Sequence, residues 1–164
     1  MQPEMNNIDI KLFLSDVDGV MTDGGLYFSE SGDQFKRFHV HDGMAFILLK
    51  EAGIKTGLIT SENLKLVELR AKRIQPDYIR MGVGFGDKLK VAEEICKQEN
   101  LSLSQVAYIG DDINCMHLLK AVGFPACPAN AVDAIHNLPG ILRLKRSGGN
   151  GAVREFADLI LNAV

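Results

Sequence analysis

Two aspartates separated by a single residue are the first candidates for chemistry in this sequence. Asp16 and Asp18 follow a short, mostly apolar run at residues 11–15, which has the pattern of a buried strand. A carboxylate can attack phosphorus and form an aspartyl-phosphate that water later cleaves. A second carboxylate beside it can protonate the leaving group and then accept a proton from water. The pair therefore indicates phosphoryl transfer, although an Asp-x-Asp motif alone also occurs in turns that start helices.

Polar side chains that follow three later apolar runs can supply the rest of such a site. Phosphoryl transfer needs cations that neutralise the phosphate oxygens, in addition to a nucleophile and a proton donor. Mg²⁺ suits a site of few carboxylates and water, and Asp111 is the natural partner of Asp16 as a ligand. Thr60 can donate its hydroxyl to a phosphate oxygen. The full set of candidates is Asp16, Asp18, Thr60, Ser61, Glu62, Lys88, Asp111 and Asp112.

Lys88 has an unusual position among these candidates. It stands at the start of a predicted helix, 87–98, where the helix dipole disfavours a cation by roughly a few tenths of a kcal/mol. Taken in isolation, a solvent-exposed lysine would be unremarkable there. Together with the other candidates, Lys88 makes better sense opposite a bound phosphate or opposite Asp16 itself.

Apolar runs that alternate with amphipathic segments predict the elements that position these side chains. Two aromatic-rich runs at 26–28 and 35–40, joined by a glycine-containing turn, predict a β-hairpin. The alternation predicts a single α/β domain over 1–164, with a mostly parallel sheet covered by helices on both faces. In such folds, ligands bind beyond the carboxyl ends of the strands, where the candidates fall. Strands are expected at 11–15, 54–60, 78–81, 106–109 and 124–127, and helices at 44–52, 63–73, 87–98, 113–121, 131–137 and 152–162.

The composition argues against several classes of partner. With 46% hydrophobic residues, 24% charged residues and a net charge of -3, the chain gives no support for nucleic-acid or polybasic membrane binding. Its longest apolar stretch, 44–49, is too short to span a bilayer. Residues 1–7 carry no positive charge before the first apolar run, so no secretory signal is expected. The cysteines Cys96, Cys115 and Cys127 are widely spaced and odd in number, which predicts reduced thiols in a cytoplasmic protein.

The same residues, in the same order, resemble the four motifs of the haloacid dehalogenase superfamily. The sequence is most similar to its capless branch, the 3-deoxy-D-manno-octulosonate 8-phosphate phosphatases and their sialic-acid-pathway relatives. The supporting stretches are DVDGVMTDGGLYF, FHVHDGMAF, GDKL, VAYIGDDIN and GGNGAVREFADLIL, which span nearly the whole chain. The four motifs are Asp16-Val17-Asp18-Gly19-Val20, Thr60, Lys88 and Gly110-Asp111-Asp112.

This resemblance implies a Rossmann-like three-layer sandwich in which a β-hairpin insertion at 25–40 takes the place of a cap domain. It implies Mg²⁺ as the cofactor and a small-molecule sugar acid phosphate as the substrate. It also implies a homotetramer, in which the hairpins build a barrel between subunits and a neighbouring subunit helps to close each active site.

The resemblance also implies a role for each motif residue. Asp16 would be the nucleophile and a metal ligand, and Asp18 would be the acid and base and bind metal through its backbone carbonyl. Asp111 would complete the metal shell. Thr60 and Lys88 would hold the substrate's phosphate, and Ser61 is predicted to bind substrate as well.

The sequence departs from the family pattern at two places, after Thr60 and at Cys115. The octulosonate enzymes usually read Thr-Gly-Arg where this chain has Thr60-Ser61-Glu62. Glu62 resembles the enzymes that act on nine-carbon ketodeoxy acids, and Arg73 falls where those carry a lysine. Both are therefore predicted to contact substrate, and the choice between an eight-carbon and a nine-carbon substrate stays open. Cys115 stands where the family commonly has an aspartate, which leaves the metal shell intact.

The sequence therefore predicts a Mg²⁺-dependent phosphomonoesterase that works through an aspartyl-phosphate. Two alternatives belong to other classes. A non-catalytic homologue could serve as an oligomerisation module in sialic-acid activation, although the intact Asp16 and Asp18 argue against this. A receiver-type signalling domain also combines Asp, Thr and Lys around Mg²⁺, but in receivers the lysine comes last, whereas Lys88 precedes Asp111.

Overall fold

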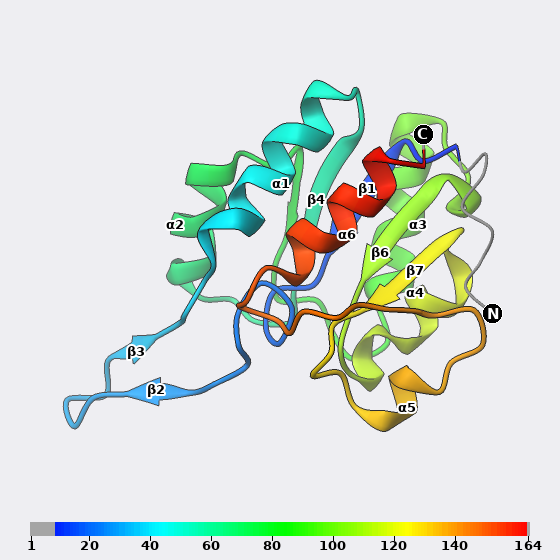
Figure 1. Ribbon diagram of the computed structural model, residues 1–164. Helices are drawn as coiled ribbons and strands as arrows, with labels where there is room; N and C mark the ends of the chain where they lie inside the picture. Colours follow the sequence, from blue (N-terminus) through cyan, green and yellow to red (C-terminus); the bar gives the residue numbers. More distant parts are fainter. Residues whose placement is uncertain (1–8, 164) are drawn as a thin grey trace.

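A computed structural model describes residues 9–163 of the chain. Six strands form one sheet in which all neighbouring pairs are parallel (Figure 1). Chain order reverses at the central strand β1, because β4 and β5 lie on one side of it and β6, β7 and β8 on the other. Ligands in such sheets bind where the order reverses, at the carboxyl ends of the strands. In spatial order the strands are β5 (Tyr78–Arg80), β4 (Lys55–Ile59), β1 (Leu12–Ser15), β6 (Val106–Ile109), β7 (Phe124–Cys127) and β8 (Leu142–Arg143).

Helices cover both faces of this sheet, which confirms the predicted α/β, Rossmann-like architecture. The central strand is buried on both sides: Phe13 faces one hydrophobic cluster, while Leu12 and Leu14 face the other. On the first face lie α1 (Val40–Glu51), α2 (Lys65–Ile74) and α6 (Ala152–Leu161), and on the second lie α3 (Lys88–Glu99), α4 (Met116–Ala121) and α5 (Asp133–His136).

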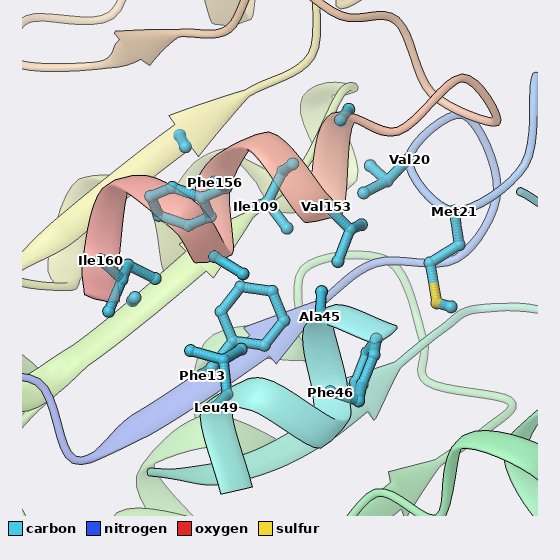
Figure 2. Close-up of a cluster of buried hydrophobic side chains, with 14 of the residues drawn as sticks. Phe13, Val20, Met21, Ala45, Phe46, Leu49, Ile109, Val153, Phe156 and Ile160 are labelled. Atoms are coloured by element: carbon cyan, nitrogen blue, oxygen red, sulfur yellow. The ribbon is translucent and has the colours of Figure 1, made fainter. Parts of the chain in front are cut away.

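The core of the first face is built where α1 and α6 meet over β1. The ring of Phe13 contacts Phe46 from α1 and Phe156 from α6, with centroid separations of 5.7 and 5.8 Å (Figure 2). Aromatic pairs at this distance contribute about 0.5–1.5 kcal/mol each beyond the area that they bury. The Asp42 carboxylate, buried in the first turn of α1, accepts the backbone N–H of Arg154 at 2.9 Å and so holds the start of α6 against α1.

The predicted hairpin is present, but its second strand is shorter than the sequence suggested. Strands β2 (Tyr27–Phe28) and β3 (Gln34–Phe35) pair antiparallel, and the hairpin projects away from the sheet (Figure 1). The expected strand over 35–40 is wrong beyond Phe35. Helix α1 starts at Val40 because His39 caps it, its ring nitrogen accepting the N–H of His41 at 3.3 Å.

Two further helices and one strand differ most from the sequence-based prediction. The expected helix over 113–121 begins with a 3₁₀ turn at Ile113–Cys115, and the helix over 131–137 is reduced to α5. Strand β8 was not predicted, since two residues give no periodic pattern.

No helix within residues 9–163 has the length and apolar character needed to cross a bilayer. The prediction that residues 1–7 hold no secretory signal lies outside the described part of the chain.

Candidate active site

A cavity of about 230 Å³ opens at the carboxyl ends of β1, β4 and β6, where the sequence predicts the site. Most of the candidate residues meet there, although they come from segments up to 96 residues apart in the sequence, from Asp16 to Asp112. Lys88 lies below the cavity rather than in its wall. The lining includes Asp16, Asp18, Thr60, Ser61, Glu62, Asp111 and Asp112.

Asp16 is held by three donors at the end of β1. Its Oδ1 accepts the N–H of Val17 at 2.7 Å, and its Oδ2 lies 2.6 Å from Lys88 Nζ. The Cys115 thiol donates to the same Oδ2 at 2.9 Å. The side chains of Asp16 and Lys88 are only 5% and 1% exposed, so the carboxylate is fixed in one orientation toward the cavity.

The structure therefore contradicts the simpler interpretation of Lys88 as a solvent-exposed lysine. It begins α3 and points inward, where its ammonium also lies 3.5 Å from Cys115 Sγ. Burial would lower the pKa of Lys88, but the contacts with Asp16 and Cys115 together outweigh that effect and leave the pKa above its usual value. A buried ammonium is stable only when it is paired, and Asp16 is one of the two partners that the sequence predicted, the other being a bound phosphate.

Cys115 acts as a hydrogen-bond donor to Asp16. Burial, followed by the charge of Asp16, raises the pKa of the thiol to about 12, so it stays protonated near neutral pH. Cys115 thus keeps a contact to the nucleophile candidate without adding a second negative charge.

Asp18 forms an ion pair that the sequence did not reveal. Lys36, which follows β3 in the hairpin, pairs with Asp18 Oδ1, and the hydroxyl of Thr22 lies 3.4 Å from the same oxygen. The other oxygen, Asp18 Oδ2, is buried and has no hydrogen-bond partner among residues 9–163. No local pattern links Lys36 to Asp18, because the pair depends on how the hairpin leaves the body of the protein.

Asp111 lies at the end of β6 against the loop that carries Asp18. Burial, then the charges of Asp16 and Asp112, raise the pKa of Asp111 to about 7. Gly19 has a positive φ of 76°, and a Cβ there would clash with the Asp111 carboxylate, so this close approach requires glycine. The Asp112 side chain has a local role, since it accepts the N–H of Ile113 at 2.7 Å.

The donor set at this point fits a hard divalent cation. Ligand atoms of Asp16, Asp111 and Cys115 lie within 4.8 Å of one another. Like-charged carboxylates held this close, one of them with a raised pKa, are stabilised by a cation between them. The protonated thiol of Cys115 is a poor ligand for such an ion, which leaves the carboxylate and backbone oxygens as the ligands.

The loop after β4 supplies the opposite wall. Thr60 is buried, and its hydroxyl accepts the N–H of Glu62 at 3.2 Å. Ser61 and Glu62 are exposed in the cavity wall. Arg73 is not brought to the site: it is exposed in the last turn of α2, the end of that helix remote from the Glu62 loop. Its predicted contact with substrate finds no counterpart within one protomer.

A clamp that the sequence did not predict fixes the loop beside Asp18. Asn130 Nδ2 donates to the carbonyl of Gly19 at 2.9 Å, and Asn130 Oδ1 accepts the N–H of Gly148 at 2.6 Å. Gly148 packs so tightly that a Cβ there would clash with the Gly19 carbonyl. The C-terminal GGNG segment is thus a backbone support for the Asp18 loop.

Comparisons with known proteins identify the family. A family model described as haloacid dehalogenase-like hydrolase matches residues 29–139. The 3-deoxy-D-manno-octulosonate 8-phosphate phosphatase of Yersinia pestis is 37% identical over 158 residues, covering 94% of this chain and 81% of the relative. The same enzyme of Haemophilus influenzae is 33% identical over 164 residues, covering 99% and 88%.

Solved structures give the same result. A 3-deoxy-D-manno-octulosonate 8-phosphate phosphatase from Moraxella catarrhalis, in complex with magnesium, phosphate and the sugar acid, superposes with a TM-score of 0.89 at 35% identity, covering 95% of this chain and 88% of that one. The cobalt-bound Haemophilus influenzae enzyme gives 0.87 at 32% identity, covering 94% and 89%. The chain therefore belongs to the haloacid dehalogenase-like hydrolases, and it is a phosphatase of that family.

Proposed function

We propose that this phosphatase hydrolyses the phosphate ester of a 2-keto-3-deoxy sugar acid, with 3-deoxy-D-manno-octulosonate 8-phosphate as the first candidate substrate. The observation that carries the proposal is the geometry of Asp16, a buried carboxylate held by Lys88 and Cys115 at the floor of a cavity that Asp18 and Asp111 also line. The names of the relatives support the substrate class, and one domain would carry the whole activity.

In this proposal Asp16 attacks the phosphorus atom. A bond forms between the Asp16 carboxylate oxygen and phosphorus, and the bond from phosphorus to the sugar oxygen breaks. Asp18 donates its proton to that sugar oxygen. In the second half, Asp18 takes a proton from water, which attacks phosphorus, releases inorganic phosphate and restores Asp16.

The cation in this proposal is Mg²⁺, which the carboxylates of Asp16 and Asp111 and the backbone carbonyl of Asp18 would hold. When bound, it would neutralise the phosphate charge that otherwise repels Asp16. Thr60 and Ser61, which line the cavity, would bind the phosphate, and Lys88 would reach it from below, beside Asp16. Lys88 has a further task, because it offsets the charge of Asp16 before substrate arrives.

Glu62 is the basis for a second candidate substrate, a nonulosonate 9-phosphate. Its carboxylate lies in the cavity wall, where it would accept hydrogen bonds from sugar hydroxyls. The octulosonate enzymes usually have arginine here, and the opposite charge would select different hydroxyl or carboxylate positions on the sugar.

A homotetramer in the cytoplasm is part of the same proposal. Four large apolar side chains of the hairpin are between 45% and 77% exposed in a single protomer, which favours their burial between subunits. The three cysteines are buried free thiols, as expected of a cytoplasmic protein. The exposed hairpin residues are Leu26, Tyr27, Phe28 and Phe35.

A phosphate-release assay tests the proposal directly. The octulosonate 8-phosphate and a nonulosonate 9-phosphate are compared with Mg²⁺ and after its removal with a chelator. We expect Mg²⁺-dependent release from at least one of them, and none from Asp16→Asn. Equally poor turnover of both sugar acid phosphates would refute the substrate class.

A further inference from the structure

Lys36 is a buried cation that the reaction described above does not use. It follows β3 and reaches inward to Asp18, and its side chain is 7% exposed, compared with 33% for Asp18. An ammonium has three donors, and the contact to Asp18 Oδ1 is the one hydrogen bond that Lys36 Nζ makes within residues 9–163. Two donors are therefore available for a ligand.

The other cations of this region contact other groups and line neither the active-site cavity nor the hairpin cavity. Lys88 pairs with Asp16 beneath the cavity. Arg37 turns outward, where it donates to Asn150 Oδ1 at 3.1 Å and lies 3.8 Å from Asp23. Arg70 donates to the carbonyl of His39 at 2.9 Å, and its Nε has no partner within residues 9–163, but Arg70 lines neither of the two cavities. Among the described residues that line the active-site cavity or the neighbouring hairpin cavity, Lys36 is the one with a positive charge.

Lys36 stands where these two cavities meet. The hairpin cavity is lined by Tyr27, Phe28, Phe35 and Lys36 on one side, and by Glu62 and Leu64 on the other. Glu62 also lines the active-site cavity, and the ammonium of Lys36 reaches Asp18 in that cavity's wall. The hairpin cavity has a volume of only about 30 Å³, so a molecule with its phosphate over Asp16 would reach the ammonium of Lys36 from the larger active-site cavity, beside Asp18.

We infer that Lys36 is the residue that selects an acidic sugar, by binding the substrate's carboxylate. This inference rests on the proposed function, which supplies a substrate with a phosphate at one end and a carboxylate at the other. The substrate carboxylate accepts hydrogen bonds from the two free donors of Lys36, while the third stays on Asp18. The same ammonium thus links the hairpin, the acid-base candidate and the bound sugar. Burying a lysine beside an aspartate costs desolvation, which a role in ligand binding explains.

The test compares Lys36→Met with the wild type on two phosphate esters. One is 3-deoxy-D-manno-octulosonate 8-phosphate, and the other is D-glucose 6-phosphate, which has no carboxylate. A charged hydrogen bond in a partly buried site predicts that Lys36→Met loses roughly 10- to 100-fold more kcat/KM on the sugar acid phosphate than on glucose 6-phosphate. A loss common to both substrates reports the contact of Lys36 with Asp18. Lys36→Arg, which keeps the charge, recovers most of the loss. Lys97→Met is the matched control, because Lys97 is exposed at the far end of α3. This variant is expected to leave kcat/KM unchanged on both substrates.

A binding measurement separates this inference from the proposed function. Titration calorimetry with the free sugar acid, 3-deoxy-D-manno-octulosonate, should show binding to the wild type and at least a tenfold weaker affinity for Lys36→Met, whose fold is checked by circular dichroism. An equal loss on both phosphate esters would overturn the inference, since Lys36 would then act only through Asp18. Unchanged affinity for the free sugar acid would also overturn it. If the wild type binds the sugar acid through Lys36 but releases no phosphate from its ester, the proposed function fails and the role of Lys36 stands.

Discussion

Replacement of Lys88 by methionine tests whether the buried Lys88–Asp16 pair organises the site. Methionine keeps the length of the side chain and removes the charge, so Asp16 Oδ2 loses a partner at 2.6 Å. Both side chains are at least 95% buried, and breaking such a pair costs about 3–5 kcal/mol because it leaves an uncompensated charge. The contacts from Val17 and Cys115 remain, which places the expected cost toward the lower end.

For a chain of this size, about 3–5 kcal/mol corresponds to a fall in Tm of roughly 6–20 °C. Thermal unfolding followed by circular dichroism, in the absence of Mg²⁺, measures it. Lys97→Met serves as the control, with an expected change within about 0.5 kcal/mol. Mg²⁺ should raise the Tm of Lys88→Met more than that of the wild type, because the ion replaces the positive charge that Lys88 placed beside Asp16.

A double mutant checks that the loss of stability comes from breaking the Lys88–Asp16 pair. Once Asp16→Asn has removed the negative charge, Lys88→Met should cost less than it does in the wild type, so the two changes are not additive. A Tm for Lys88→Met within 2–3 °C of the wild type, or full additivity of the two substitutions, would refute the claim that this pair is a tightly coupled part of the site.

Two further predictions concern the supports of the site. Asn130→Ala removes both hydrogen bonds of the clamp between Gly19 and Gly148, so we expect kcat to fall by roughly tenfold or more at nearly unchanged KM, with unchanged kcat as the contrary result in steady-state kinetics. Burial raises the pKa of Asp42 above its ordinary value of 3.8, so the folded state favours the protonated carboxyl group. The contribution of Asp42 to the free energy of unfolding is therefore complete below pH 3.8 and is lost as pH rises through the higher folded-state pKa. The stability of Asp42→Asn relative to the wild type should therefore increase with pH in urea unfolding series run from pH 4 to 8, and a pH-independent difference would contradict this.

The rule that ligands bind beyond the carboxyl ends of parallel strands made the core of the candidate site predictable from the sequence. Asp16, Thr60 and Asp111 each follow an apolar run that becomes a parallel strand, and parallel strands bring their carboxyl ends to one edge. Lys88 was predicted for a different reason, because a cation at a helix start needs a negative partner. Those arguments need only local patterns and one topological rule.

The residues that escaped prediction depend on how distant segments pack. Lys36 and Asn130 reach the Asp18 loop across 18 and 111 residues of sequence, and no spacing rule encodes either contact. The early start of α1 was missed because His39, a less common cap than serine or aspartate, ends the extended segment. Arg73 shows the reverse: its position relative to a motif predicted a contact that the course of α2 does not provide in one protomer.

The proposed mechanism requires that Asp16 becomes covalently phosphorylated during turnover. The most direct measurement is rapid acid quenching of the Mg²⁺-loaded enzyme with a sugar acid phosphate, followed by borohydride reduction and peptide mass spectrometry. Reduction of an aspartyl-phosphate converts that residue to homoserine, so we predict homoserine at position 16 and at no other aspartate, and none in the absence of substrate. Homoserine at another position, or undiminished phosphate release by Asp16→Asn, would contradict the account.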